Sequence, residues 1–155
     1  MAQSRSRFSP LRTLGAALAF GLALASGALA ADKPGEIQVK TRTGTHAITV
    51  EWAVTPSQRE RGLMGREKMA PNHGMLFDFG NEQPLYFWMK NTPLSLDMIF
   101  IKADGRTSRI ERGAKPFSED LIPGGAPARY VLEMVAGSAE RLGLAPGDRF
   151  TIPKP

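Results

Sequence analysis

Turn signals at short intervals divide this chain into segments that are too short for long helices. Turn-forming residues occur at Thr43-Gly44, Asn72-His73-Gly74, residues 81–84, Asp104-Gly105, residues 113–127 and Pro146-Gly147-Asp148. In the best-patterned segments between such turns, apolar and polar residues alternate, as they do in half-buried strands. The sequence therefore predicts an all-β, mainly antiparallel single domain, built as a jelly-roll-like sandwich or a partly open barrel with two short helices.

The expected strands are short and lie between these turns. They cover residues 36–41, 45–53, 75–79, 86–101 as a hairpin, 107–111, 129–135 and 149–152. Asp104-Gly105 is a two-residue hairpin signal, and it should connect a strand ending near Lys102 to the next one. Residues 113–127 contain three Pro and three Gly, which indicates a long loop of the kind that often carries function.

Two short helices are expected. Thr55, Pro56 and Gln58 form a capping-box pattern with proline at the first helical position, and Gly62 is a plausible stop. This pattern predicts a helix over residues 56–61. A second short helix should begin at Gly137-Ser138 and end at Gly143.

The N-terminal segment has the layout of a secretory signal peptide. Three arginines and no acid precede an apolar run over residues 14–25, and Ala28-Leu29-Ala30 is a small-residue cleavage pattern. We expect residues 1–30 to be a signal peptide, residues 31–35 a short polar lead and residues 36–153 a single β domain. The protein should be periplasmic or secreted. An uncleaved membrane anchor is the alternative.

Charge and cysteine content exclude several classes of protein. Three of the 20 Lys and Arg residues and none of the 15 Asp and Glu residues precede residue 31, which leaves 17 against 15. Such a balance does not indicate a nucleic-acid partner, which needs clustered basic residues. The chain has no Cys, so the expected exported domain has no disulfide and must be held by its core.

Several sequence blocks occur together in a distinctive order. They are Arg59-x-x-Gly62-Leu63-Met64-x-Arg66, Gly74-Met75-Leu76-Phe77, Phe87-Trp88-Met89-Lys90-Asn91-Thr92, Leu96-Asp97-Met98-Ile99-Phe100, Asp104-Gly105, Val131-Leu132-Glu133 and Gly147-Asp148. In this order the chain resembles the family known as domain of unknown function 192, over nearly all of the expected mature chain. The resemblance implies an all-β, jelly-roll-like single domain, frequently behind an export signal, with no established activity or cofactor.

The stretch 86–101 is the main candidate for a functional surface. As a hairpin with residues 91–94 as its loop, it would place Trp88 opposite Asp97 on one face. The ring of Trp88 could then stack on a ligand beside polar groups from Lys90, Asn91 and Thr92. In the alternative, Trp88 fills the core and Asp97 is neutralised by Arg112 or caps the loop.

Glu133 poses a similar question, because it shares a strand face with Val131 and Val135. Together with Asp97 it could form the general acid and base of a hydrolase. A structural ion pair with Arg59, Arg66 or Arg129 is the alternative. Arg59 and Arg66 could also form an anion-binding corner, since guanidinium groups bind carboxylates and phosphates.

These observations favour an exported, non-catalytic ligand-binding or accessory module with a cleft near residues 86–101. Its ligand would be a small or glycan-like molecule, and no cofactor or metal is expected, since the two His and the Met residues lack metal-binding spacing. A hydrolase and a protein-interaction domain remain the alternatives. The candidate ligand-binding residues are Arg59, Arg66, Trp88, Lys90, Asn91, Thr92, Asp97 and Glu133.

Overall fold

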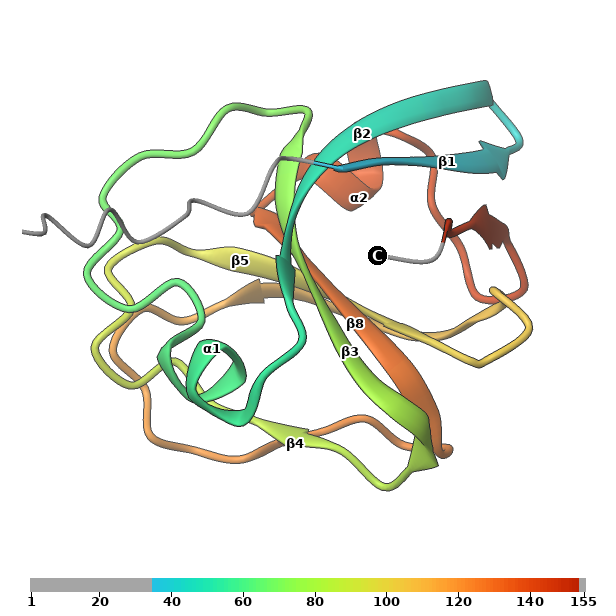
Figure 1. Ribbon diagram of the computed structural model, residues 1–155. Coiled ribbons are helices and arrows are strands. Elements are labelled where there is room, and N and C mark those ends of the chain that lie inside the picture. Colours follow the sequence, from blue (N-terminus) through green and yellow to red (C-terminus); the bar gives the residue numbers. More distant parts are fainter. Residues whose placement is uncertain (1–34, 154–155) are drawn as a thin grey trace, which may run out of the picture. The chain divides into compact units, whose positions relative to one another are not determined.

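The computed structural model describes residues 35–153, which form nine strands and two short helices (Figure 1). In chain order the elements are β1 (Gly35–Thr41), β2 (Gly44–Ala53), α1 (Pro56–Arg61), β3 (His73–Gln83), β4 (Tyr86–Phe87), β5 (Leu96–Ile101), β6 (Thr107–Ala114), β7 (Ile122–Pro123), β8 (Ala128–Val135), α2 (Ser138–Arg141) and β9 (Arg149–Thr151). The predicted signal peptide and its cleavage point lie outside the described residues. No described helix is long and apolar enough to cross a membrane.

Seven strands form one curled sheet in the order β6-β5-β8-β3-β2-β1-β9, and β4 pairs with β7 in a second, two-stranded sheet. The large sheet is mixed, because β2 and β3 run parallel. A parallel pair needs a crossover connection, and α1 with the irregular residues 62–72 provides it. The prediction of a single, mostly β domain is confirmed. The prediction of a mainly antiparallel sheet is confirmed only in part, because one pair of strands is parallel. The jelly-roll topology stays a prediction.

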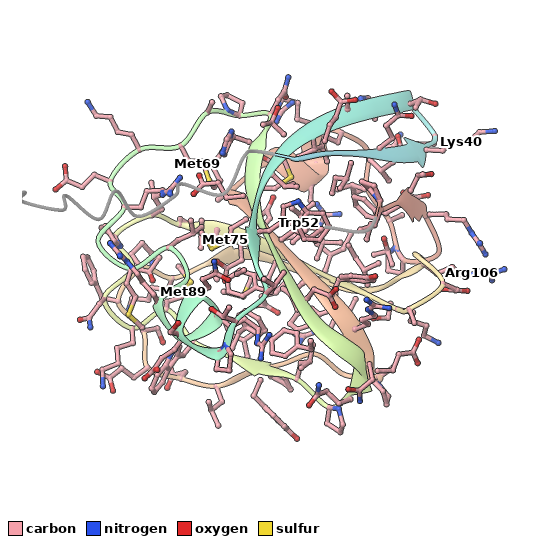
Figure 2. The ribbon with its side chains drawn as sticks, in the orientation of Figure 1. Lys40, Trp52, Met69, Met75, Met89 and Arg106 are labelled. Atoms are coloured by element: carbon pink, nitrogen blue, oxygen red, sulfur yellow. The ribbon has the colours of Figure 1, made fainter. Side chains whose placement is uncertain are left out.

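The two faces of the large sheet bury separate apolar clusters. The first cluster includes Ile37, Leu76 and Leu132, and the second includes Phe77, Met98 and Val131. Figure 2 shows Met75 and Met89 of the second cluster in the interior, while Lys40 and Arg106 project outward. Each central strand therefore contributes alternate side chains to the two clusters, as the pleat of a strand requires.

The predicted hairpin over residues 86–101 is wrong. β4 pairs with β7, whereas β5 pairs with β6 and β8. The connection between β4 and β5 is held from elsewhere in the chain: the Met89 N–H donates to the Ser118 carbonyl, at 2.8 Å, and the Phe117 N–H donates to the Thr92 carbonyl, at 3.1 Å. The predicted loop over residues 113–127 is confirmed over residues 115–121 and 124–127, whereas residues 113–114 belong to β6 and residues 122–123 form β7.

Two local predictions are confirmed. Gly105 N–H donates to the Lys102 carbonyl in the turn between β5 and β6, and Ile99 pairs with Ile110 as the hairpin requires. At the start of α1, the Thr55 side chain accepts from the Gln58 N–H, while the Gln58 side chain accepts from the Thr55 N–H at 2.8 Å. This reciprocal capping fixes the helix beside the pocket described below.

Candidate functional site

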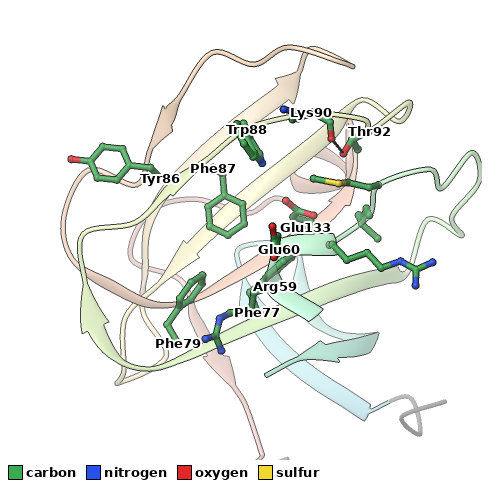
Figure 3. Close-up of a pocket in the computed structure, with 14 residues that line it drawn as sticks. Arg59, Glu60, Phe77, Phe79, Tyr86, Phe87, Trp88, Lys90, Thr92 and Glu133 are labelled. Carbon is green, nitrogen blue, oxygen red and sulfur yellow. Dashed lines mark hydrogen bonds between the residues drawn. The ribbon is translucent and has the colours of Figure 1, made fainter. Parts of the chain in front are cut away.

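A cavity of about 240 Å³ lies beside α1 (Figure 3). Its walls come from α1 and the residues that follow this helix, from β3 and β4, and from the segment 88–92, and Glu133 of β8 also lines it. Its lining residues are Arg59, Glu60, Arg61, Gly62, Leu63, Met64, Phe77, Phe79, Tyr86, Phe87, Trp88, Lys90, Thr92 and Glu133. The volume is below the usual range for drug-sized ligands, so the cavity suits a small molecule.

Aromatic rings form much of the cavity wall. Phe87 on β4 stands edge-on to Phe77 and Phe79 of β3, with ring centroids 5.2 and 6.1 Å apart. Trp88 follows Phe87 at the mouth, and its side chain is 42% exposed although tryptophan is usually well buried. The short pairing of β4 with β7 places these rings over the second face of the large sheet.

The carboxyl group of Glu133 is the buried polar group of this cavity. On β8, Glu133 pairs with Met75 of β3 on one side and Met98 of β5 on the other, and it is only 5% exposed. It forms no hydrogen bond or ion pair with any described residue. Burial raises the pKa of the Glu133 carboxyl to about 8, because the charged form loses its solvation in the interior.

Arg59 lines the cavity but is held by groups other than Glu133. Arg59 donates to the carbonyl oxygens of Val54 and Asp78, and its guanidinium lies 5.0 Å from the Phe79 ring centroid. Figure 3 shows this guanidinium beside Phe79 rather than beside the Glu133 carboxyl. The predicted structural pair between Glu133 and Arg59 is therefore wrong.

Lys90 is held at the rim. Its Nζ lies 5.1 Å from the centroid of the Trp88 ring and 3.7 Å from Oε2 of Glu119. Thr92, which is buried, donates its hydroxyl to the Lys90 carbonyl at 3.1 Å and so fixes the segment between them. These contacts give the mouth of the cavity an aromatic surface and a fixed positive charge.

Asp97 does not belong to this cavity. It is 1% exposed on β5 and accepts hydrogen bonds, both 2.9 Å long, from the backbone N–H groups of Gly113 and Ala139. Arg112 instead donates to the Leu144 carbonyl, so the predicted pairing of Asp97 with Arg112 is wrong. An irregularity in the pairing of β5 with β6 between Leu96 and Met98 turns the Gly113 N–H toward the carboxylate.

Arg66 also lies apart from the cavity. It donates to both carboxylate oxygens of Glu51, which His73 also contacts at 3.0 Å. The hydrogen bond from Arg66 lowers the pKa of Glu51 despite partial burial. The predicted anion-binding corner of Arg59 and Arg66 is wrong. The Arg59 guanidinium binds backbone carbonyl oxygens beside the cavity, whereas the Arg66 guanidinium binds the Glu51 carboxylate away from it.

A second carboxylate near α1 is neutralised within the protein. Arg129 donates from Nε and a terminal nitrogen to the two oxygens of Asp78, each at 2.9 Å. Burial acts to raise the pKa of Asp78, but the hydrogen bond from Arg129 brings it below the usual value. Arg129 is thus the partner of Asp78 and not of Glu133.

Sequence reasoning located part of this site. Of the eight predicted site residues, Arg59, Trp88, Lys90, Thr92 and Glu133 line the cavity, and Asn91 lines an adjoining hollow with Trp88 and Lys90. The Phe77, Phe79 and Phe87 rings were missed as site residues. The three rings belong to or pack against the second apolar cluster, and the separation of β4 from β5 leaves a cavity beside Phe87.

The described residues contain no group of three or more His, Asp or Glu side chains suited to hold a metal ion. The cavity contributes two carboxylates, Glu60 and Glu133, and no histidine. Its chemistry is that of hydrogen bonding, ion pairing and aromatic contact.

Comparison with known proteins agrees with this class of fold, a mostly β single domain with a curled sheet and two small helices. Residues 37–152 match the family model DUF192, described as "Uncharacterized ACR", and the chain belongs to this family. No curated protein matches the chain.

Two crystal structures are similar to the chain. One, from Sinorhizobium meliloti 1021 and described as a candidate transcription regulator, is 53% identical, with a TM-score of 0.74, over 76% of this chain and 92% of that one. The other, a protein of unknown function from Novosphingobium aromaticivorans DSM 12444, is 34% identical, with a TM-score of 0.74, over 77% of this chain and 85% of that one.

Proposed function

We propose that this protein is an exported, non-catalytic module that binds a small molecule in the cavity between α1, β3 and β4. The observation that carries the proposal is Glu133, a buried carboxyl without a partner that opens into an aromatic cavity. Buried polar groups in folded proteins are nearly always hydrogen-bonded, so one that lacks a partner and faces a cavity calls for an explanation. A bound ligand supplies it.

The hydrolase alternative lacks its acid and base. Asp97 and Glu133 lie on opposite faces of the sheet, and two backbone N–H groups already occupy the Asp97 carboxylate. The remaining carboxylate at the cavity, Glu60, is on the exposed side of α1. A binding role needs no second catalytic group and therefore fits these residues better.

If this chain shared the role in the description of the Sinorhizobium protein, transcription regulation, and exerted it by binding DNA, it would need a basic surface, which its residues support poorly. Beyond residue 30 it has 17 Lys and Arg against 15 Asp and Glu. Arg59, Arg66 and Arg129 are engaged with carbonyls or carboxylates, and phosphate backbones require free basic side chains.

A ligand screen tests the proposal. Small amines, alcohols, carboxylates and sugar fragments would be added to the purified protein, with binding detected by ligand NMR and by the melting temperature. We expect hits that Trp88→Ala weakens at least tenfold and that Leu121→Ala, a matched change of another exposed apolar side chain outside the cavity, leaves unchanged. Hits that bind equally well to both variants, or no hits, would contradict a binding site here.

A further inference from the structure

The three buried carboxylates of the described residues, and the half-buried Glu51, differ in their partners. Asp78 is held by Arg129, Asp97 by two backbone N–H groups and Glu51 by Arg66 and His73. Glu133 has no such partner among the described residues, although it is only 5% exposed, between Asp97 at 1% and Asp78 at 8%. The partner that the fold gives to each of these other acids, a positive charge or a pair of N–H donors, is therefore missing at the cavity.

The surroundings of Glu133 are suited to a positive charge that comes with an apolar body. Phe77 and Phe87 stand edge to face beside it, and Trp88 forms the mouth. The faces of aromatic rings attract cations, and a carboxylate in a site of low dielectric constant attracts them more strongly than it does in water. Leu63 and Met64 complete the lining with apolar surface.

None of the charged residues that line the cavity places a positive charge against the Glu133 carboxyl. Arg59 is bound to two carbonyl oxygens and stacked on Phe79, and Lys90 lies over Trp88 near Glu119. Glu60 and Arg61 lie at the exposed end of α1. None of them makes an ion pair with Glu133.

We propose that the ligand of this cavity is a small organic cation, an ammonium group on an apolar or aromatic body, whose charge lies against the Glu133 carboxylate. This inference rests on the proposed binding function and adds the chemical class of the ligand. In the free protein at neutral pH, Glu133 holds a proton because burial raises its pKa to about 8. Binding of the cation transfers that proton to solvent and leaves an ion pair between the ammonium group and the carboxylate.

Because binding displaces a proton, the inference predicts the direction in which the affinity of the ligand changes with pH, and this direction can be measured. A cation gains affinity as pH rises toward 8, because less work is needed to remove the proton from Glu133. An anionic or hydrogen-bond-accepting ligand would instead need the protonated carboxyl as a donor, so its affinity would fall above pH 8. A neutral apolar ligand would show no dependence.

Isothermal titration calorimetry with three probes tests the inference. Benzyltrimethylammonium has a charge that is independent of pH, benzyl alcohol is neutral, and benzoate is an anion above about pH 5. Each would be titrated into the protein between pH 6 and 9. We expect the Kd of the ammonium probe to fall by up to tenfold for each pH unit below 8 and then to level off. Benzyl alcohol and benzoate should bind at least tenfold more weakly at pH 8.

Glu133→Gln is the decisive variant, since it keeps the shape of the side chain, the other charged groups of the cavity and the aromatic walls. It should weaken binding of the ammonium probe at least tenfold at pH 9 and abolish the dependence on pH. Phe87→Leu provides a second variant that removes a ring without changing any charge, and it should weaken the ammonium probe while preserving the pH profile. Near-ultraviolet circular dichroism would establish that both variants are folded.

The outcomes separate this inference from the proposed function. Tighter binding of benzoate or benzyl alcohol, lost in Trp88→Ala, would overturn the cation while leaving a binding site in place. Ammonium binding that is unchanged in Glu133→Gln would likewise overturn the role of the carboxylate. If none of the three probes binds at millimolar concentration, the cation inference fails, whereas the proposed binding function fails only if the wider fragment screen also gives no hit that depends on Trp88.

Discussion

Asp97 and Glu133 lie on neighbouring strands, but their side chains leave opposite faces of the sheet. Asp97 pairs with Met134 and Glu133 pairs with Met98, so the two carboxyl groups are separated by the sheet itself. One is bound by two backbone N–H groups and the other opens into a cavity without a partner. The first therefore stabilises the fold, and the second is available to a ligand.

Replacing Glu133 with Gln should stabilise the protein increasingly as pH rises. The folded-state pKa of Glu133 is raised to about 8 from an ordinary value of 4.5, so the folded protein holds a proton that the unfolded chain has lost. The contribution of Glu133 to stability is thus fully present below pH 4.5 and is lost as pH rises to 8, by up to about 1.4 kcal/mol per pH unit. Urea unfolding at pH 5, 7 and 9 measures this difference.

The control for this prediction is Glu60→Gln, which changes an exposed acid at the same cavity. It should alter the unfolding free energy by about 0.5 kcal/mol or less at each pH. A stability difference between wild type and Glu133→Gln that does not vary with pH would show that Glu133 is not buried as described.

Asp97→Asn should destabilise the fold by roughly 2 to 3 kcal/mol. Asparagine keeps one neutral acceptor oxygen and puts an NH2 group in place of the other, so one of the Gly113 and Ala139 N–H groups loses its acceptor and the other keeps only an uncharged one. The exposed Asp120→Asn is the matched control, with an expected change of about 0.5 kcal/mol or less. Equal urea midpoints for the two variants would refute the structural role of Asp97.

Thr55→Ala should cost about 1 kcal/mol, because the Gln58 N–H loses its capping acceptor. Thr55→Ser keeps the hydroxyl and should retain most of the stability. Hydrogen exchange at the Gln58 amide would show whether the loss is local to α1. Equal exchange in the alanine and serine variants would argue against the capping box.

The first 30 residues should direct export and be removed after Ala30. N-terminal sequencing of protein recovered from a periplasmic or culture fraction of a bacterial host should begin at Ala31-Asp32. Substituting Ala28 and Ala30 with bulky residues should leave the precursor uncleaved. Recovery of an intact, membrane-bound chain from the unchanged sequence would favour the anchor instead.

The sequence predicted those features of the fold that depend on contacts between residues close together in the chain. The capping residues Thr55 and Gln58 are three positions apart, and Asp104-Gly105 connects adjacent strands, so both features could be predicted. The position of Glu133 on a face with Val131 also follows from strand alternation alone.

The arrangement of Trp88 and Asp97 could not be derived in the same way. Their predicted pairing assumed that residues 86–101 fold on themselves, but Met89 is held by Ser118 and β4 pairs with β7. These contacts join residues 29 to 37 positions apart, and no pattern near Trp88 specifies them. The same long-range pairing creates the cavity, which is why its aromatic wall was not foreseen.

The most direct test of this account is the titration of the Glu133 carboxyl by carbon-13 NMR, with Glu133→Gln used to assign the signal. In the free protein we expect a pKa of about 8, and saturation with benzyltrimethylammonium should lower it. A pKa near the ordinary value of 4.5 in the free protein would contradict the account, because it would mean that water or a charged group of the protein already serves as the partner of Glu133.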